Sequence, residues 1–227
     1  MPAIPTPSSR AGRRAFRRQF LAMAARRVKP GSGSDLAALS AMRRVTMQWW
    51  HDVEKSLSGI PHAIAGGQAA NAYAPPRASI DLDVAIVTRD AARCATALTR
   101  DGWQRTGELA GIPGSTWRHP EGHALDILEV HEPWAETALR EAAANLIDGL
   151  PTLPMPYLVL MKLDASRTTD LGDVARMLGG ADDPTIARAR ELVERHGNRQ
   201  DVQDFDQLVA MGRLERGVID PPRPDLA

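Results

Sequence analysis

Short stretches of alternating apolar and polar residues occupy the first half of the chain, and a period of two is typical of β-strands with one buried face. The alternation is clearest around Leu82, where apolar residues separate two aspartates. It predicts strands at 62–65, 80–84, 103–109, 115–118 and 123–130. Segments rich in glycine and proline at 111–114 and 120–122 predict turns between the later strands.

In other segments apolar residues recur every three or four positions, which predicts amphipathic helices. Three such segments lie early, at 35–58, 66–74 and 90–101, and Asp35 is a suitable N-cap for the first. After residue 132 helical segments dominate, at 136–146, 154–166, 169–178, 184–195 and 201–216. Strands early and helices late predict an α+β fold: a small mixed β-sheet core flanked by helices, followed by a helical C-terminal half.

The first 34 residues differ in composition from the rest, since they contain no acidic residue and end in the linker-like Gly31–Ser34. We therefore expect three regions. They are a basic and disordered arm at 1–34, an α/β core at 35–150 and a helical C-terminal region at 151–220.

The basic residues of this arm allow several interpretations. If the arm were helical, the arginines at positions 10, 13, 14, 17 and 18 would share one face. A disordered or helical arm of this kind could bind the backbone of RNA or DNA. An arginine-rich segment without acids is also typical of a cleaved organelle-targeting sequence, and a misassigned start codon would explain it equally well.

Charge and cysteine usage narrow the classes of protein. Lysine and arginine together number 28, as do aspartate and glutamate, so the whole chain exerts no net attraction on nucleic acid or a membrane. There is no apolar run of about 18 residues, so no membrane span is expected. Because Cys94 is the only cysteine, we expect neither a disulfide framework nor a zinc cluster within one chain, and a reducing cytoplasm as the location.

The candidate chemistry begins with carboxylates in apolar strands. Asp81 and Asp83 are two residues apart, so on a strand their side chains would point to the same side. Gly66 and Gly67 precede them at the start of a predicted helix, where bare N–H groups can approach a polyphosphate. Asp126 lies in another apolar strand and would join the pair if the strands are neighbours, although it could instead pair with an arginine. Such carboxylates are suited to divalent cations that neutralise phosphates.

Lys162 is a second candidate, because it is one of only three lysines and lies within an apolar run. It could reach a phosphate, or it could be a surface lysine paired with Asp164 or Asp170. Asp170 and Asp173 would share one face of a helix, either in a functional role or in salt bridges with nearby arginines.

Together, Gly66-Gly67, Arg77, Asp81-x-Asp83, Asp126 and the segment YLVLMKLDASRTTDLGDVARML at 157–178 resemble the polymerase-beta nucleotidyltransferase superfamily. The chain is most similar to the bacterial branch that includes minimal nucleotidyltransferases and the toxin half of abortive-infection type IV toxin–antitoxin systems. The resemblance implies a nucleotidyltransferase core that transfers a nucleoside monophosphate from an NTP to an acceptor and releases pyrophosphate.

The resemblance also implies a role for each matched residue. Asp81 and Asp83 would hold two Mg²⁺ ions, and Asp126 would bind the second ion and help to activate the acceptor hydroxyl. The residues expected to bind the nucleotide, or to orient the groups that do, are Gly66, Gly67, Gln68, Arg77, Lys162, Asp170 and Asp173.

Two positions depart from the family pattern: Gln68 stands where serine or threonine is usual, and Ser79 where threonine is frequent. Two classes of function stay open. One is an active nucleotidyltransferase acting on RNA ends, a protein side chain or a small molecule such as an antibiotic, which as a toxin would have an antitoxin partner. The other is a non-catalytic nucleotide- or RNA-binding module.

Overall fold

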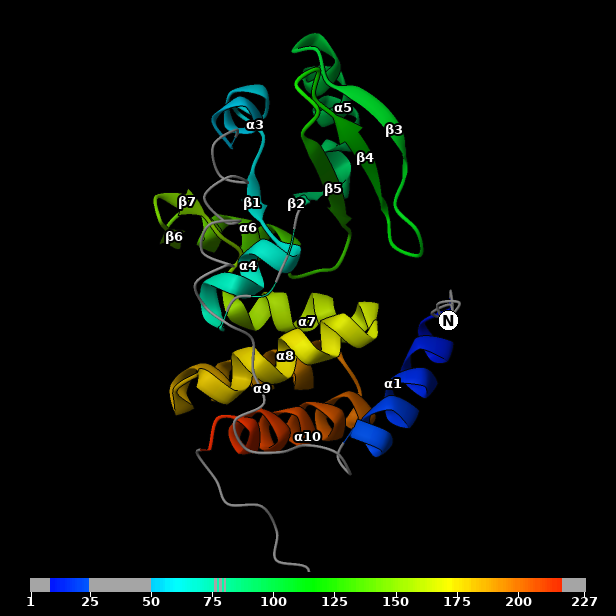
Figure 1. Cartoon of the computed structure of the whole chain (residues 1–227), viewed down its shortest axis with the longest axis vertical. Helices are drawn as coiled ribbons and strands as arrows, with labels where there is room; N and C mark the ends of the chain where they lie inside the picture. The colour runs from blue at the N-terminus through cyan, green and yellow to red at the C-terminus, as the bar shows by residue number, and fades with distance from the viewer. Residues whose placement is uncertain (1–8, 25–49, 76, 78, 80, 218–227) are drawn as a thin grey trace, which may run out of the picture. The chain divides into compact units, whose positions relative to one another are not determined.

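The computed structural model describes residues 9–24, 50–75, 77, 79 and 81–217 (Figure 1). Most of the helix predicted at 35–58 lies outside the described residues, and its described part, α3, spans Trp50–Ser56. Of the strand predicted at 80–84, Ile80 also lies outside them.

The contacts of the chain divide it into two compact units. The sheet unit consists of Asp35–Ala72 and Pro76–Pro154, and the helical unit of Met1–Ser34, Tyr73–Pro75 and Met155–Ala227. Each unit has its own apolar core, so each is described by itself.

A five-stranded sheet in the order β1-β2-β5-β4-β3 forms the centre of the sheet unit. Its strands are β1 (His62–Ile64), β2 (Leu82–Val87), β3 (Gln104–Glu108), β4 (Gly114–Arg118) and β5 (Ala124–Val130). Strands β2 and β5 run parallel and the other neighbours antiparallel, so the sheet is mixed. This sheet, with helices around it and helices after it, confirms the predicted α+β class.

The central strand β2 carries apolar residues on both sides because helices and neighbouring strands cover it. Five of its six residues are buried, and only Asp83 is half-exposed. Helix α6 (Ala135–Ala142) packs against β1 and β2, while α5 (Ala91–Arg100) packs against α3 and β3. Cys94 and Leu98 of α5 are buried, as the helical spacing predicts.

The predicted helix at 136–146 is wrong in its last part, because α6 ends at Ala142 and a small hairpin follows. Strands β6 (Leu146–Ile147) and β7 (Leu150–Pro151) pair across Asp148 and Gly149, which have φ angles of 53° and 79°. Two consecutive positive φ values are those of a tight hairpin turn, for which Asp-Gly is a favoured pair.

The helical unit is built from α7 (Met155–Ala165), α8 (Thr168–Gly180), α9 (Asp183–His196) and α10 (Arg199–Glu215). Helices α8 and α10 approach closely where Gly179 faces Gly212, since a Cβ on either residue would overlap the backbone of the other helix. Side-chain caps begin α9 at Asp182 and α10 at Asn198, where a full capping box is present.

The expectation of a disordered arm at 1–34 is wrong for residues 10–24, which form helix α1 (Arg10–Ala24). Arg17 is 1% exposed and donates to Asp204 at 2.7 Å and to Asp201. Arg14 meets both carboxylate oxygens of Asp201, at 3.0 and 2.7 Å. Arg14 and Arg17, on the face for which nucleic-acid binding was one interpretation, bind acids of this same chain that lie more than 180 residues further along it.

Hydrogen bonds to Asp201 lower the pKa of its carboxyl group. Burial works to raise the pKa of Asp201, but hydrogen bonds from Arg14, from the Asn198 backbone and from Arg17 outweigh burial and lower that pKa. Arg10 and Arg13 add ion pairs to Asp164 of α7, at 2.9 and 3.2 Å. Helix α1 is thus bound to α7 and α10 through charged side chains.

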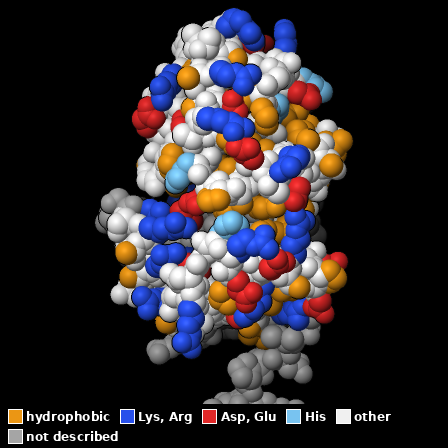
Figure 2. All heavy atoms as spheres, turned by 180° about the vertical axis from the view of Figure 1, so that it is seen from behind, with side chains coloured by type: hydrophobic (Ala, Val, Ile, Leu, Met, Phe, Trp, Pro, Cys, Tyr) orange, Lys and Arg blue, Asp and Glu red, His pale blue; other side chains and the backbone are white. Residues whose placement is uncertain are grey.

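Charged side chains of both signs are interspersed on the face shown in Figure 2, in keeping with the zero net charge. None of the described helices combines the length with the apolar character that crossing a bilayer requires.

Candidate active site

Two of the predicted metal ligands lie side by side in the sheet unit. Strands β2 and β5 are parallel neighbours, and Asp83 is the register partner of Asp126. The residues on either side of each aspartate, such as Leu82 and Ile127, are buried, so both carboxylates project from the same face of the sheet. Both aspartates are half-buried. The structure thus brings together acids that lie 43 positions apart in the sequence.

The paired glycines lie directly against the first of these acids. Gly66 has a φ of 55°, and a Cβ there would overlap the carboxylate of Asp83. The backbone N–H of Gly67 donates to Oδ2 of Asp83 at 3.2 Å, and the N–H of Ala65 to its carbonyl oxygen at 2.8 Å. Only glycine allows this close approach of the start of α4 (Gly66–Tyr73) to the strand, because it has no side chain and tolerates positive φ.

Asp81 differs from the prediction, since it lies in a bend just before β2 and its side chain is exposed. The ladder between β2 and β5 begins only at Leu82, opposite Leu125, so no strand pairing fixes Asp81. It remains two residues from Asp83 at the edge where the sheet begins. Its predicted role in metal binding stays a prediction.

Side chains of α4 hold the segment that leads to β2. Gln68 donates from Nε2 to the carbonyl of Ser79 at 2.8 Å, and its side chain is buried. Asn71 bonds the backbone of Arg77 in both directions, at 2.8 and 2.9 Å. Gln68 therefore uses its amide on the backbone, where the family's hydroxyl is expected to contact phosphate.

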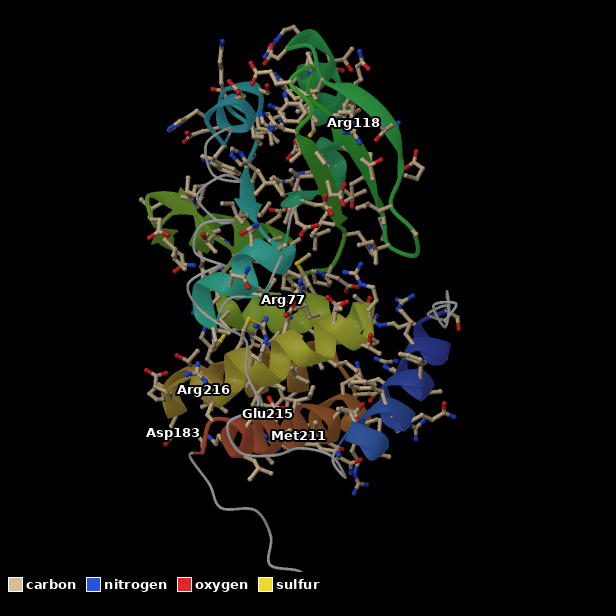
Figure 3. All side chains as sticks on the ribbon, viewed as in Figure 1. Arg77, Arg118, Asp183, Met211, Glu215 and Arg216 are labelled. Carbon is tan, nitrogen blue, oxygen red and sulfur yellow. The ribbon has the colours of Figure 1, made fainter. Side chains whose placement is uncertain are left out.

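Sequence reasoning missed Asn71 as a positioning residue. Its signal was the spacing, because residues four apart on a helix share a face, and Asn71 follows Gly67 by four. Arg77, labelled in Figure 3, places an Nη2 atom 3.3 Å from where a Cβ of Gly67 would be. Its guanidinium thus lies beside the start of α4, together with the hydroxyl of Ser79.

Lys162, Asp170 and Asp173 belong to the helical unit, where the structure brings all three together. Nζ of Lys162 lies 3.1 Å from Asp170 and 2.8 Å from Asp173, and all three side chains are almost fully buried. The alternative of a surface lysine is therefore wrong in its position, although the pairing with Asp170 that it included is present. Arg167 binds Asp170 at 2.7 Å and Arg176 binds Asp173 at 2.6 Å, so the salt bridges to nearby arginines are present as well.

Arg176 extends this buried cluster, because it also donates to the backbone carbonyl of Pro75. Lys162 comes from α7 and the two aspartates from α8, so the cluster joins two consecutive helices. The arrangement holds the ammonium group of Lys162 in one position, which is what a phosphate-binding lysine or a structural ion pair would need.

The single cysteine does not take part in this chemistry. Burial, followed by the charges of Glu129 and Asp90, raises the pKa of Cys94 to about 12. A thiol with such a pKa is not a nucleophile near neutral pH.

No protein-family model and no curated protein sequence matches the chain. Among solved structures, ANT(2″)-Ia in complex with adenylyl-2″-tobramycin gives a TM-score of 0.42 at 16% identity, covering 74% of this chain and 97% of that one. The lincomycin-bound lincosamide antibiotic adenylyltransferase LnuA gives a TM-score of 0.31 at 13% identity, and the match covers 40% of this chain and 58% of that one.

The Cid1 poly(U) polymerase gives a TM-score of 0.28 at 17% identity, and the match covers 65% of this chain and 46% of that one. The chain therefore matches less than two thirds of the lincosamide enzyme and of the poly(U) polymerase, but nearly all of ANT(2″)-Ia. At these identities and TM-scores the likenesses do not assign the chain to a family.

Proposed function

We propose that the chain is a metal-dependent nucleotidyltransferase, which moves a nucleoside monophosphate from an NTP to an acceptor hydroxyl and releases pyrophosphate. The observation that carries this proposal is the register of Asp83 and Asp126 on neighbouring parallel strands. Gly66 and Gly67 add a helix start against the first of these carboxylates. Adjacent carboxylates suit a divalent cation, and N–H groups at a helix start suit a phosphate.

The donor set fits Mg²⁺, because that ion prefers hard oxygen ligands. Asp81, Asp83 and Asp126 would hold two such ions, which when bound would neutralise charge on the transferred phosphoryl group and its leaving group. Asp126 would in addition help to activate the acceptor hydroxyl. The protein would otherwise act by positioning, since phosphoryl transfer needs little covalent chemistry from side chains.

The residues proposed to act on the nucleotide are those that the resemblance of the sequence implies, taken one unit at a time. Gly66, Gly67 and Arg77 would contact the triphosphate, and Gln68 would support them through its bond to the backbone of Ser79. Lys162 would reach a phosphate as a point charge, oriented by Asp170 and Asp173.

The acceptor is proposed to be an RNA end, a protein side chain or a small molecule, in a cytoplasmic setting. The motifs at 66–83 and 157–178 also favour a toxin with an antitoxin partner. Expression in bacteria would then arrest growth, a neighbouring gene product would relieve the arrest, and Asp83→Asn would abolish it.

The decisive experiment incubates the protein with each labelled NTP, Mg²⁺, total RNA and cell extract, and measures label transfer and pyrophosphate release. Asp83→Asn and Asp126→Asn should each lower transfer by about 100-fold or more, because each removes a ligand of the charge-stabilising centre. Folding should be retained, since asparagine keeps an oxygen that accepts the bond from Gly67.

Asp101→Asn is the matched control, because Asp101 carries the same change at the end of α5 and pairs with its neighbour Arg100. Transfer by that variant should equal that of the wild type. Transfer by Asp83→Asn at the wild-type rate would overturn the proposal. Binding of NTP or RNA without any pyrophosphate would instead support a non-catalytic binding module.

A further inference from the structure

The turn between β4 and β5 brings together two histidines and a glutamate. Strand pairing ends at Arg118 and Ala124, and the intervening residues are His119-Pro120-Glu121-Gly122-His123. Backbone bonds close the turn, from Gly122 N to His119 O at 2.8 Å and from His119 N to His123 O at 2.9 Å. The two imidazoles are thus held at the base of one hairpin, with the glutamate between them in sequence.

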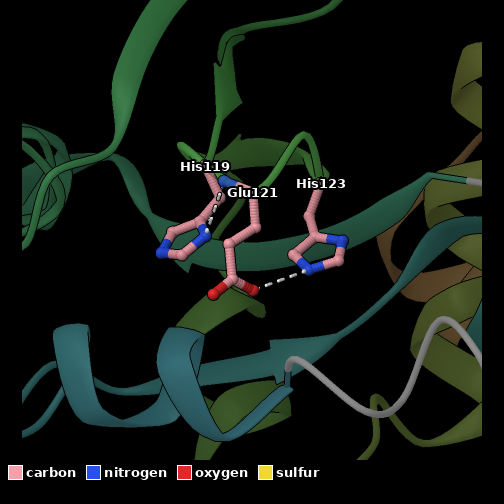
Figure 4. A group of neighbouring side chains, drawn as sticks. All are labelled: His119, Glu121 and His123. Atoms are coloured by element: carbon pink, nitrogen blue, oxygen red, sulfur yellow. Dashed lines mark hydrogen bonds and ion pairs between the residues drawn. The ribbon is translucent and has the colours of Figure 1, made fainter.

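The side chains of this turn face one another (Figure 4). A ligand atom from each of His119, Glu121 and His123 lies within 4.8 Å of the other two. Nε2 of His123 lies 3.4 Å from Oε2 of Glu121, and the two imidazole rings stack at 5.9 Å with an interplanar angle of 16°.

His119 is held in place by an aromatic contact. The ring of His119 packs on the buried Trp103 at 4.9 Å between centroids, which restricts its rotamers. The N–H of Glu121 approaches Nδ1 of His119 at 3.4 Å, a long contact that is readily exchanged for a stronger one. Glu121 itself is exposed, so its carboxylate can move toward both rings.

We propose that His119, Glu121 and His123 bind a divalent transition-metal ion of the Zn²⁺ class. Imidazole nitrogens with one carboxylate are the donors that Zn²⁺ takes at about 2.0–2.2 Å, and the hard cation Mg²⁺ prefers oxygen alone. The three ligand atoms lie within 4.8 Å of one another, so small rotations of the side chains would place each of them at bonding distance from one shared ion. Three protein ligands leave a fourth position for water or another donor.

One ion cannot bind both the centre of this turn and Asp126. His123 precedes Asp126 by three residues, which is about 10 Å along a strand, too far for one ion to bind both. A single cysteine argues against a zinc cluster built on thiolates, but histidine and glutamate supply a different donor set.

The test uses the full chain, freed of any affinity tag and stripped of metal, with excess Mg²⁺ present. Zn²⁺ is titrated by calorimetry, and Co²⁺ is used in parallel because its visible absorption reports nitrogen and oxygen ligands. One ion per chain should bind, and His123→Gln or Glu121→Gln should weaken binding at least about tenfold.

His131→Gln is the matched control, since His131 lies 3.7 Å from Glu132 but belongs to no group of three possible metal ligands among the described residues. It should bind Zn²⁺ as the wild type does, and so should Asp126→Asn. The proposal is overturned if no saturable binding occurs, or if His123→Gln binds Zn²⁺ as tightly as His131→Gln does.

Discussion

Four buried carboxylates of the helical unit pair with cationic side chains, whereas Asp83 of the sheet unit lies beside a glycine and a second aspartate. In the helical unit, Asp170 and Asp173 are bound by Lys162 and by flanking arginines, and Asp201 and Asp204 by Arg17. In the sheet unit, Asp83 receives a backbone N–H from Gly67 and has another aspartate as its register neighbour.

Under the proposed function, this difference would separate acids that stabilise packing from acids that bind a metal ion. The desolvation cost of a buried acid is offset by its attraction to a paired guanidinium, and the pair ties two helices together. Two acids beside each other repel, and a shared divalent cation would relieve that repulsion, which is the basis of the proposed metal site. The predictions that follow alter one unit at a time and ask whether stability or catalysis responds.

The largest expected change in stability concerns Arg17. Arg17→Met should lower the free energy of unfolding by about 3–5 kcal/mol, because it leaves Asp201 and Asp204 buried without that guanidinium. Urea denaturation measures the change. Arg18→Met is the control on the same helix, where the side chain is exposed and the change should stay within about 0.5 kcal/mol. Equal losses in both variants would refute a packing role for the charges.

An intermediate effect is expected at the glycine beside Asp83. Gly66→Ala should destabilise by about 1–3 kcal/mol, because φ is 55° and the new Cβ would overlap the carboxylate. Nucleotidyl transfer should fall as well, since Asp83 must move. Gly172→Ala is the control in α8, where a Cβ meets nothing within 4 Å and should stabilise by about 0.5–1 kcal/mol. If Gly66→Ala changed neither the stability nor the transfer activity, the close approach of α4 to Asp83 would be dispensable.

The smallest effect is the pH dependence of the contact between α1 and α10. The pKa of Asp201 is lowered in the folded state, so its stabilisation is complete above the unfolded value of about 3.9 and is lost as pH falls through the folded value. Unfolding in urea between pH 7 and pH 3 measures this loss. Arg14→Met removes one cause of the low pKa and should flatten the acid slope, whereas Arg18→Met should leave it unchanged. An identical slope in Arg14→Met would contradict this account.

The alternation of apolar residues was sufficient to predict strands that carry Asp83 and Asp126, because a period of two places every second residue on one face. It was insufficient to show that those strands are parallel neighbours, which depends on the whole order of the sheet. Asp81 follows the same alternation, yet it lies outside the strand because the pairing with β5 starts one residue later.

Local composition is a poor guide to the structure of residues 10–24. The absence of acids in that stretch suggested a disordered arm, but Asp164, Asp201 and Asp204 lie 140 or more residues further along the chain. The histidines at 119 and 123 escaped notice for a related reason. The turn at 120–122 was predicted, but the stacking of the two imidazole rings and the contact of His119 with Trp103 depend on the folded path of the chain.

By itself the sequence determined the class of the fold and the types of side chain available for chemistry, because helical and strand periods depend only on near neighbours along the chain. Tertiary structure alone decided which charges neutralise each other: Arg17 with Asp204, and Lys162 with Asp170 and Asp173. Electrostatic pairing acts through space over a few ångströms, so it follows the folded path of the backbone and not the order of residues.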